Sequence, residues 1–395
     1  NTNDGVVSTK RVLRDPSAWM NIVVSIDTEQ STASNRVKIY INGVQETSLE
    51  GDGSGDPTYP SEDHDCTGFG RDTKITVGAR SMDTPDKFFD GYLAEVVYID
   101  GLQLAPTSFG EFDEDSPTIW KPIDVSELTF GTNGFYLDFE ASGNLGNDAN
   151  GGTDLTEVNL AATNQATDSP TNNFATMNPL LIALGATVPA LSEGNLRVAN
   201  TIANKMQASY SNFAVSSGKW YVEIKMTAGT AFRPGISTLN IGQAEGEAGE
   251  NQNSPGLWTE GWGYFYDDGV LYNDNGDAGG TYAAFAAGDI VSIGLDMDNS
   301  KLFFGVNGTW QNSADPAAGT NSIDISGIAA GSDVAFGAAV ENSSAGATYS
   351  DVNFGSPVYA NSSSAADGNG YGDFEYAPPS GFLALCTKNL GSTGG

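Results

Sequence analysis

The sequence is poor in the residues that several common kinds of site require. Its 395 residues include one histidine, His64, and two cysteines, Cys66 and Cys386. A single histidine leaves almost no room for a zinc site rich in histidine or for a triad with a histidine base. Two cysteines so far apart form neither a disulfide framework nor a CxxC site. No run approaches the roughly 20 apolar residues of a membrane span, so we expect no membrane insertion.

Basic residues are also scarce. The chain has 17 Lys and Arg against 50 Asp and Glu, which gives a formal net charge of -33. Because nucleic acids are bound by clusters of Lys and Arg, this balance argues against nucleic-acid binding and against an anionic membrane surface. An acidic, glycine-rich surface suits a salty extracellular setting and the binding of hard cations. The chain opens NTNDGVVSTK without Met, which indicates a piece of a longer protein.

Short apolar runs bounded by Gly, Asn, Asp and Pro dominate the chain, and long helical periodicity is absent. Such runs, separated by 49 glycines, are typical of antiparallel β-strands. The expected strands are 20–27, 36–43, 73–80, 91–100, 134–140, 219–226, 262–268, 289–296, 301–308, 333–340 and 351–355. The sequence therefore predicts an all-β protein built from antiparallel β-sandwiches of jelly-roll type.

The chain is long enough for two domains, each with its own core. A segment rich in Pro and Asn interrupts the strand pattern between them. We expect a first sandwich over residues 1–160, a connector over 161–194 that docks on a neighbouring domain, and a second sandwich over 195–390.

Two stretches about 270 residues apart follow the same pattern. Each has an apolar strand that ends in Asp27 or Asp296, then a polar turn, then a second apolar strand that ends in Asn-Gly. Asn-Gly tolerates the positive φ of a tight hairpin turn. Each stretch is therefore expected to form two hairpins in succession, in the middle of a twisted sheet.

These motifs resemble two known families. The order SAWMNIVVSID, NRVKIYINGVQE, TKITVGAR and FFDGYLAEVVYIDGLQL over residues 10–105 is similar to laminin-G-like, concanavalin A-like lectin and glucanase domains. The order SSGKWYVEIKM, NIGQAEG, GWGYFYDDG, FAAGDIVSIGLDMDNSKLFFGVNGTW and VAFGAAVENSSAGATYSDVNFG over 195–358 resembles a SPRY domain. The tandem, with its linker segments, is similar to structural proteins of tailed bacteriophages, especially marine ones.

The lectin-like half departs from its family pattern, because only NTNDGVVSTKRVLRD precedes the strand that begins with Trp19. Laminin-G-like domains normally have several strands there. Either these strands have been removed, or GFYLDFEASGNLGNDANGG, over 134–152, fills the gap.

No strand carries the pair of carboxylates that a glucanase of this fold would need. Retaining hydrolysis requires two carboxylates about 5 to 5.5 Å apart, which alternate positions of one strand can supply. Glu95 is followed by two valines, and Glu223 has Lys225 two residues later. We therefore expect no enzymatic activity, with a secreted protein that binds or hydrolyses glucan kept as an alternative.

One loop combines aromatic side chains with many carboxylates. GLWTEGWGYFYDDGVLYNDNGDAGG spans 256–280 and is the expected working surface of the second domain. Flat aromatic rings stack on sugars, and SPRY domains resemble peptide readers that use the loops between strands. The candidate ligand-binding residues are Trp258, Trp262, Tyr272 and Trp310, of which Trp262 is equally consistent with a core position.

The same loop offers oxygen ligands for calcium. Carboxylates on flexible, glycine-rich loops are the ligands that calcium prefers. Asp and Asn are also ordinary turn residues, and we favour solvated turns over calcium binding. The candidate calcium ligands are Asp268, Asp274 and Asp277.

These observations favour a non-enzymatic virion protein, a tail fibre or other appendage that binds a host-surface glycan or protein. The expected location is the virion surface, outside the cell, and the expected partners are other virion proteins and further copies of the chain. Linked modules raise avidity without new contacts, so weak sites would suffice. The alternative is a structural decoration or fibre module that packs on other virion subunits.

Overall fold

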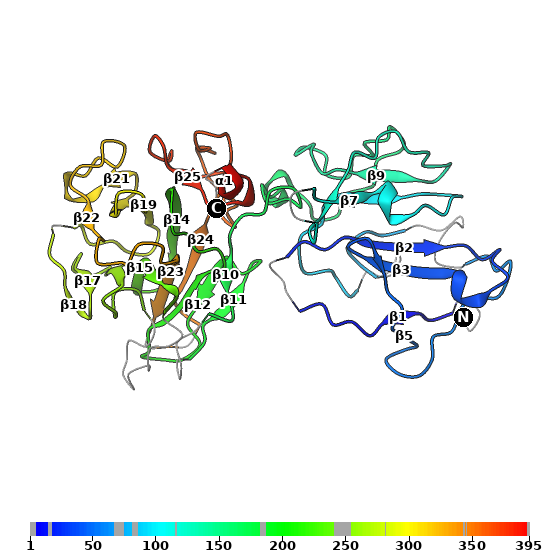
Figure 1. Cartoon of the computed structure of the whole chain (residues 1–395), viewed down its shortest axis with the longest axis horizontal. Coiled ribbons are helices and arrows are strands. Elements are labelled where there is room, and N and C mark those ends of the chain that lie inside the picture. The colour runs from blue at the N-terminus through cyan, green and yellow to red at the C-terminus, as the bar shows by residue number, and fades with distance from the viewer. Residues whose placement is uncertain are drawn as a thin grey trace. The chain divides into compact units, whose positions relative to one another are not determined.

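The computed structural model describes most of the chain, as drawn in Figure 1. It divides into two compact units, Asn1–Gln165 and Ala166–Gly395. No helix among the described residues is long and apolar enough to cross a membrane. The described residues are 5–14, 18–66, 75–80, 86–114, 117–181, 187–240, 254–280, 282–342, 344 and 346–392.

The first unit consists of short antiparallel strands in small sheets. The sheets are β2-β3-β4, β1-β5, β6-β9 and β7-β8. The strands are β1 Ser8–Thr9, β2 Ile22–Ile26, β3 Val37–Ile41, β4 Val44–Gln45, β5 Leu49–Glu50, β6 Val96–Tyr98, β7 Gly110–Phe112, β8 Trp120–Pro122 and β9 Phe135–Leu137. Three short 3-10 helices lie between them, η1 Ala33–Asn35, η2 Pro106–Ser108 and η3 Ala162–Asn164.

The second unit is a sandwich of two large sheets. One follows the order β10-β13-β23-β15-β16-β17-β18, and the other follows β11-β12-β24-β14-β19-β20-β21, with β22 and β25 attached to it. The strands are β10 Met177–Asn178, β11 Ala190–Ser192, β12 Arg197–Ala199, β13 Gln207–Ser211, β14 Lys219–Ala228, β15 Ala231–Thr238, β16 Gly261–Tyr264, β17 Leu271–Asn273, β18 Gly276–Asp277, β19 Ile290–Asp296, β20 Lys301–Val306, β21 Thr309–Trp310, β22 Ile323–Asp324, β23 Val334–Glu341, β24 Tyr349–Asn353 and β25 Leu383–Ala384. The helices that the structure describes here are η5 Gln311–Ser313 and α1 Thr387–Ser392.

The core of the second unit lies between these two sheets. Successive side chains of a strand point to opposite faces, so every second residue of β14 reaches the core. Trp220, Val222 and Ile224 of β14 pack there with Ile236 of β15 and Phe336 of β23. The prediction of an all-β protein of antiparallel sandwich type is confirmed.

The two repeated stretches form the predicted hairpins. β2 pairs with β3 and β3 with β4, as β19 pairs with β20 and β20 with β21. Asn42 and Asn307 have φ of 48° and 49° at the second turn of each copy. Their side-chain oxygens accept equivalent hydrogen bonds, at 2.9 Å from the N–H of Asn21 and at 3.0 Å from that of Ile290.

Two expected strands of the first unit differ most from the structure. Of the strand expected over 91–100, only β6 is extended and paired, because Glu95 has a positive φ of 53° and ends the regular backbone before Val96. Of the strand expected over 73–80, residues 75–80 are described and contain no strand, because Gly78 turns the chain with a φ of 80°.

Two segments beside the expected domain boundaries join the sheets of their units. β9, inside GFYLDFE, pairs with β6, so this stretch belongs to the sheets of the first unit. The segment that the sequence marked as a connector supplies β10 and β11, which pair with β13 and β12 of the second unit.

Candidate functional site

A loop of the second unit, Ser254–Glu260, lies directly on the outer face of the sheet formed by β23, β15 and β16. This face carries glycines where strands normally carry side chains. A methyl group at Gly235, Gly263 or Gly337 would lie within 2.8 Å of an atom of Pro255. The missing side chains therefore let the loop approach the sheet backbone closely.

Arg233 of β15 fixes the start of this loop. Its side chain is 3% exposed, and its guanidinium lies 4.4 Å from the ring centroid of Tyr272 and 5.0 Å from that of Phe265. Its Nη1 donates a hydrogen bond of 2.9 Å to Ser254 Oγ. Burial lowers the pKa of Arg233, and among the described residues no carboxylate forms an ion pair with it. Aromatic rings thus take the place of a carboxylate partner.

The hairpin of β17 and β18 fixes the other end of the loop. Asn273 Nδ2 donates to the carbonyl oxygens of Thr259 at 2.9 Å and Gly261 at 2.8 Å. The backbone N–H of Asp274 donates to the carbonyl oxygen of Trp258 at 3.2 Å. These bonds join two parts of the expected working surface, 256–280.

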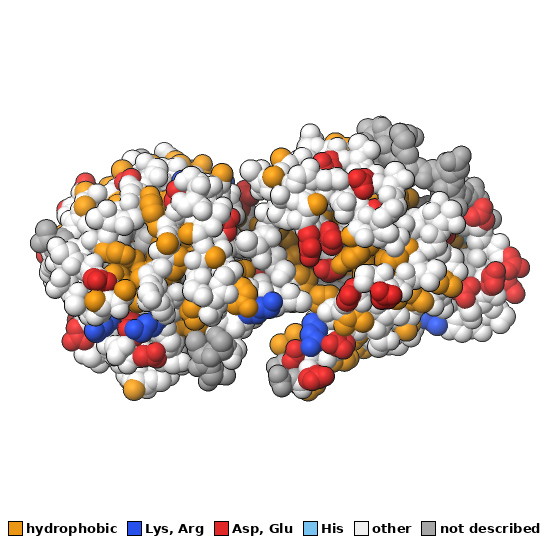
Figure 2. Space-filling view, turned by 90° about the horizontal axis from the view of Figure 1, so that it is seen from above, with side chains coloured by type: hydrophobic (Ala, Val, Ile, Leu, Met, Phe, Trp, Pro, Cys, Tyr) orange, Lys and Arg blue, Asp and Glu red, His pale blue; other side chains and the backbone are white. Residues whose placement is uncertain are grey.

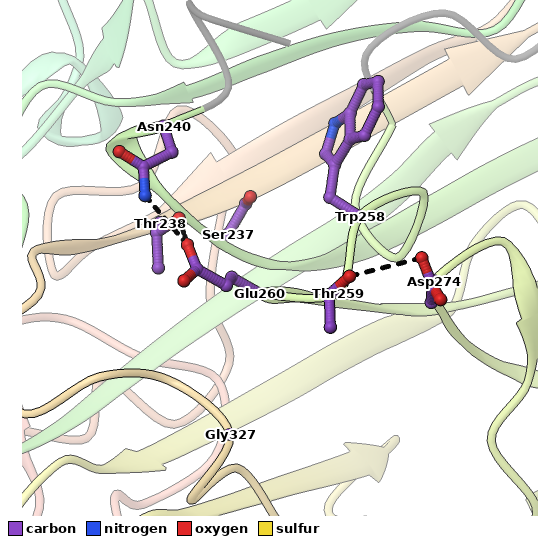
Figure 3. A pocket seen from close by; sticks show the side chains of 8 residues that line it. All are labelled: Ser237, Thr238, Asn240, Trp258, Thr259, Glu260, Asp274 and Gly327. Atoms are coloured by element: carbon purple, nitrogen blue, oxygen red, sulfur yellow. Dashed lines mark hydrogen bonds between the residues drawn. The ribbon is translucent and has the colours of Figure 1, made fainter.

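A pocket of about 340 Å³ lies beside this loop (Figure 3). We call it the Trp258 pocket. Within it, Glu260 Oε2 accepts hydrogen bonds from Thr238 Oγ1 at 2.8 Å and from Asn240 Nδ2 at 2.9 Å. Thr259 Oγ1 donates to Asp274 Oδ1 at 3.3 Å. The lining residues that the structure describes are Ser237, Thr238, Asn240, Trp258, Thr259, Glu260, Asp274 and Gly327.

The four aromatic candidates lie in different surroundings. Trp258 is half-buried and lines the pocket, and its buried Nε1 has no hydrogen-bond partner among the described residues. Trp262 is 6% exposed and belongs to the core between the sheets, which leaves it a structural role. Tyr272 packs against Arg233, and Trp310 packs edge-on against Tyr221 with ring centroids 6.3 Å apart. Of these four residues, Trp258 is the one that lines the Trp258 pocket.

The three calcium candidates act as turn residues. Asp268 Oδ1 accepts from the N–H of Val270 at 3.1 Å, and Asp277 Oδ1 accepts from that of Gly279 at 2.8 Å. Asp274 lies in the turn between β17 and β18 and also lines the pocket. In the part of the chain that the structure describes, no group of three or more His, Cys, Asp or Glu side chains could hold a metal ion. The structure therefore brings these carboxylates to separate turns.

Sequence reasoning missed Glu260 and the residues that orient it. Glu260 lies between Trp258 and Trp262 in the sequence. A carboxylate between two tryptophans was the signal that could have marked Glu260 as a candidate site residue. Thr238 and Asn240 come from the end of β15 and just beyond it, some 20 residues earlier, so nothing in the sequence alone links them to Glu260.

Glu223, the carboxylate of the second unit weighed for catalysis, is fully buried on β14. Its strongest bonds come from the backbone N–H groups of Tyr376, at 2.7 Å, and Glu375, at 3.0 Å. The hydroxyl of Tyr221 donates at 3.0 Å, and Asn353 Nδ2 and the Tyr359 hydroxyl add weaker bonds. Both carboxylate oxygens are used inside the protein, where they fasten the C-terminal segment to the sheet.

The comparisons with known proteins concern this unit. The family model of the SPRY domain matches residues 219–316. This range contains every described residue of the Trp258 pocket except Gly327. The expectation of a SPRY domain in the second half is confirmed over these residues.

A solved structure, the SPRY domain of human HERC1, is similar at 16% sequence identity and a TM-score of 0.33. The alignment covers 45% of this chain and 96% of that chain. No curated protein matches the chain. The laminin-G-like resemblance of residues 10–105 and the resemblance to phage proteins stay predictions.

Proposed function

We propose that the chain is a non-catalytic binding protein whose second unit holds a protein partner at the Trp258 pocket. The observation that carries this proposal is the placement of Trp258. Its ring is half-buried at a pocket, and the loop that bears it is pinned to the sheet at both ends. Aromatic side chains fixed in this way are frequent anchors of protein interfaces. The SPRY match over the same residues supports a protein-interaction module.

The surroundings of Glu223 argue against a catalytic role for this carboxylate. A catalytic carboxylate must reach substrate, whereas Glu223 is 0% exposed and receives hydrogen bonds from five groups of the protein. It therefore fits a structural role better than that of an acid or base.

As part of the same proposal, the protein belongs to a virion appendage of a tailed bacteriophage and binds its partner outside the cell. Support for it comes from the sequence resemblance of the tandem. Repeated copies on one particle would make a single shallow pocket effective, because linkage raises avidity by roughly 10² to 10⁴. The partner would be a protein of the host surface.

Selection from a random peptide display library tests the proposal without knowledge of the partner. Intact protein is used as bait, and the Trp258→Ala variant serves for counter-selection. We expect peptides that bind the wild type and not the variant. Failure to enrich any such peptide would overturn the proposal, and this result is the one expected of a module that only packs on other virion subunits. Specific binding to a glycan array, without any such peptide, would overturn it as well.

A further inference from the structure

In the part of the chain that the structure describes, the carboxylates of the Trp258 pocket have no cationic partner. Glu260 and Asp274 line it, and no Lys, Arg or His is among the lining residues that the structure describes. Within the described chain neither carboxylate forms an ion pair. Asp and Glu side chains are visible on both units in Figure 2, and the chain has a formal net charge of -33, so no general excess of positive charge compensates them. A cation from outside would meet favourable electrostatics here.

Glu260 is oriented through one of its two carboxylate oxygens. The hydrogen bonds that it accepts from Thr238 and Asn240 both go to Oε2. Among the described residues, no donor bonds to Oε1. A carboxylate can accept about four hydrogen bonds, so a donor from a partner can be added without breaking the existing ones. Thr238 belongs to β15, which holds the carboxylate on a rigid element.

Trp258 supplies the second feature of a cation site. A guanidinium or ammonium group is attracted to the face of an indole ring, which is the most effective aromatic partner. Figure 3 shows the side chain of Trp258 extending from the turn that also bears Thr259 and Glu260 and that leads into β16. Trp258, Glu260 and Asp274 all line the same pocket.

Resting on the proposed function, we propose that the Trp258 pocket receives an arginine side chain of the partner protein. The guanidinium is planar, stacks on aromatic rings and presents several N–H donors at once. It can therefore contact the Trp258 ring and donate to Glu260 Oε1 together. Lysine, a compact point charge that is strongly hydrated, satisfies only part of this arrangement.

The test compares two peptides that differ in charge and hardly in shape. Ac-Gly-Arg-Gly-amide and its citrulline analogue are titrated into ¹⁵N-labelled protein, and the Trp258 indole N–H signal is followed. This signal is assigned by its absence in Trp258→Phe. Because a charge-assisted hydrogen bond and a cation–π contact are both lost, we expect citrulline to bind at least about tenfold more weakly than arginine. Equal affinities would overturn the proposal.

Matched variants separate the pocket from the overall charge. Glu260→Gln keeps the shape of the side chain, and we expect at least about a tenfold loss of affinity for the arginine peptide. Asp277→Asn removes the same charge from an exposed residue outside the pocket, and we expect a change within about twofold, since exposed charges are screened. Equal losses in the two variants would show general charge attraction and contradict the proposal.

The peptide selection distinguishes the two proposals. Peptides that depend on Trp258 and are enriched in arginine support both. Peptides that depend on Trp258 and lack arginine would leave the proposed function intact and overturn the arginine assignment. A selection without any peptide that depends on Trp258 would overturn both.

Discussion

The side-chain amide of Asn273 donates a hydrogen bond of 2.9 Å to the carbonyl oxygen of Thr259, and with it the β17–β18 hairpin is joined to the loop that bears Trp258. The same amide reaches the carbonyl oxygen of Gly261 at 2.8 Å. One side chain therefore satisfies two backbone groups beside Trp258, which restricts the loop before any partner binds.

Replacing Asn273 should weaken peptide binding at the Trp258 pocket and also lower the stability of the second unit. Asn273→Ala removes both bonds, and we expect a loss of about 1 to 2 kcal/mol in the free energy of unfolding. Binding of a selected peptide should weaken as well, because the partner must then order the loop. Thermal unfolding and peptide titration measure the two effects. Unchanged peptide affinity in the folded variant would show that the hairpin has no part in the site.

The second prediction concerns the outer face of the sheet, where Gly235, Gly263 and Gly337 lie under Pro255. A methyl group at Gly235 would lie 2.0 Å from the carbonyl oxygen of Trp262 and 2.7 Å from Pro255 Cβ. Gly235→Ala should therefore destabilise the second unit by about 1 to 3 kcal/mol or more. Gly276→Ala is the matched control, since its nearest atom would be 3.6 Å away. Similar melting temperatures of the two variants would mean that the loop does not need the glycine face.

The buried carboxylate of Glu223 predicts how stability changes with pH. Burial raises the pKa of Glu223, and its hydrogen bonds only partly oppose this shift. Between the ordinary and the raised pKa, the folded state holds the proton more tightly than the unfolded chain. Stability from this group therefore increases as the pH falls through that window and decreases as the pH rises.

Glu223→Gln cannot titrate, so the comparison isolates this group. We expect the unfolding free energy of the wild type, measured relative to the variant, to increase as the pH is lowered from 7 toward the ordinary pKa of Glu, about 4.3. Chemical denaturation at several pH values measures it. A difference that decreases on acidification would mean that the hydrogen bonds outweigh burial.

The pairing of β9 with β6 leads to a prediction for the first unit. Leu137 of β9 is 2% exposed, so Leu137→Ala should cost about 2 to 5 kcal/mol in the unfolding of that unit. Leu102, at 51% exposure, is the control position, where alanine should have little effect. Calorimetry should show a shift in the transition of the first unit alone. A shift confined to the second unit would contradict the assignment of this segment.

Local patterns were sufficient to predict the hairpins. Asn-Gly after an apolar strand favours a tight turn by backbone preference alone, and both copies, at Asn42 and Asn307, have the expected positive φ. The strands expected over 73–80 and 91–100 failed where positive φ at Gly78 and Glu95 interrupts the backbone. Nothing in the residue types there signals such a conformation for a glutamate.

The site was predictable only where it lies in one stretch of sequence. Trp258 and Asp274 occur in one glycine-rich loop and do share the pocket. Trp262 is four residues from Trp258, yet it points to the core, because β16 begins at Gly261 and its alternation turns Trp262 inward. The contribution of Thr238 depends on the pairing of β15 with β16, a tertiary contact that no local pattern encodes.

The affinity of a selected peptide for Trp258→Ala, measured beside the melting temperature, tests the central claim most directly. Loss of one large aromatic contact should weaken binding by about 5- to 150-fold, which corresponds to roughly 1 to 3 kcal/mol. The second unit should stay folded, whereas Trp262→Ala, in the core, should destabilise it by about 3 to 5 kcal/mol. Peptide affinity that is unchanged in a folded Trp258→Ala variant would contradict the account, as would unfolding caused by that substitution.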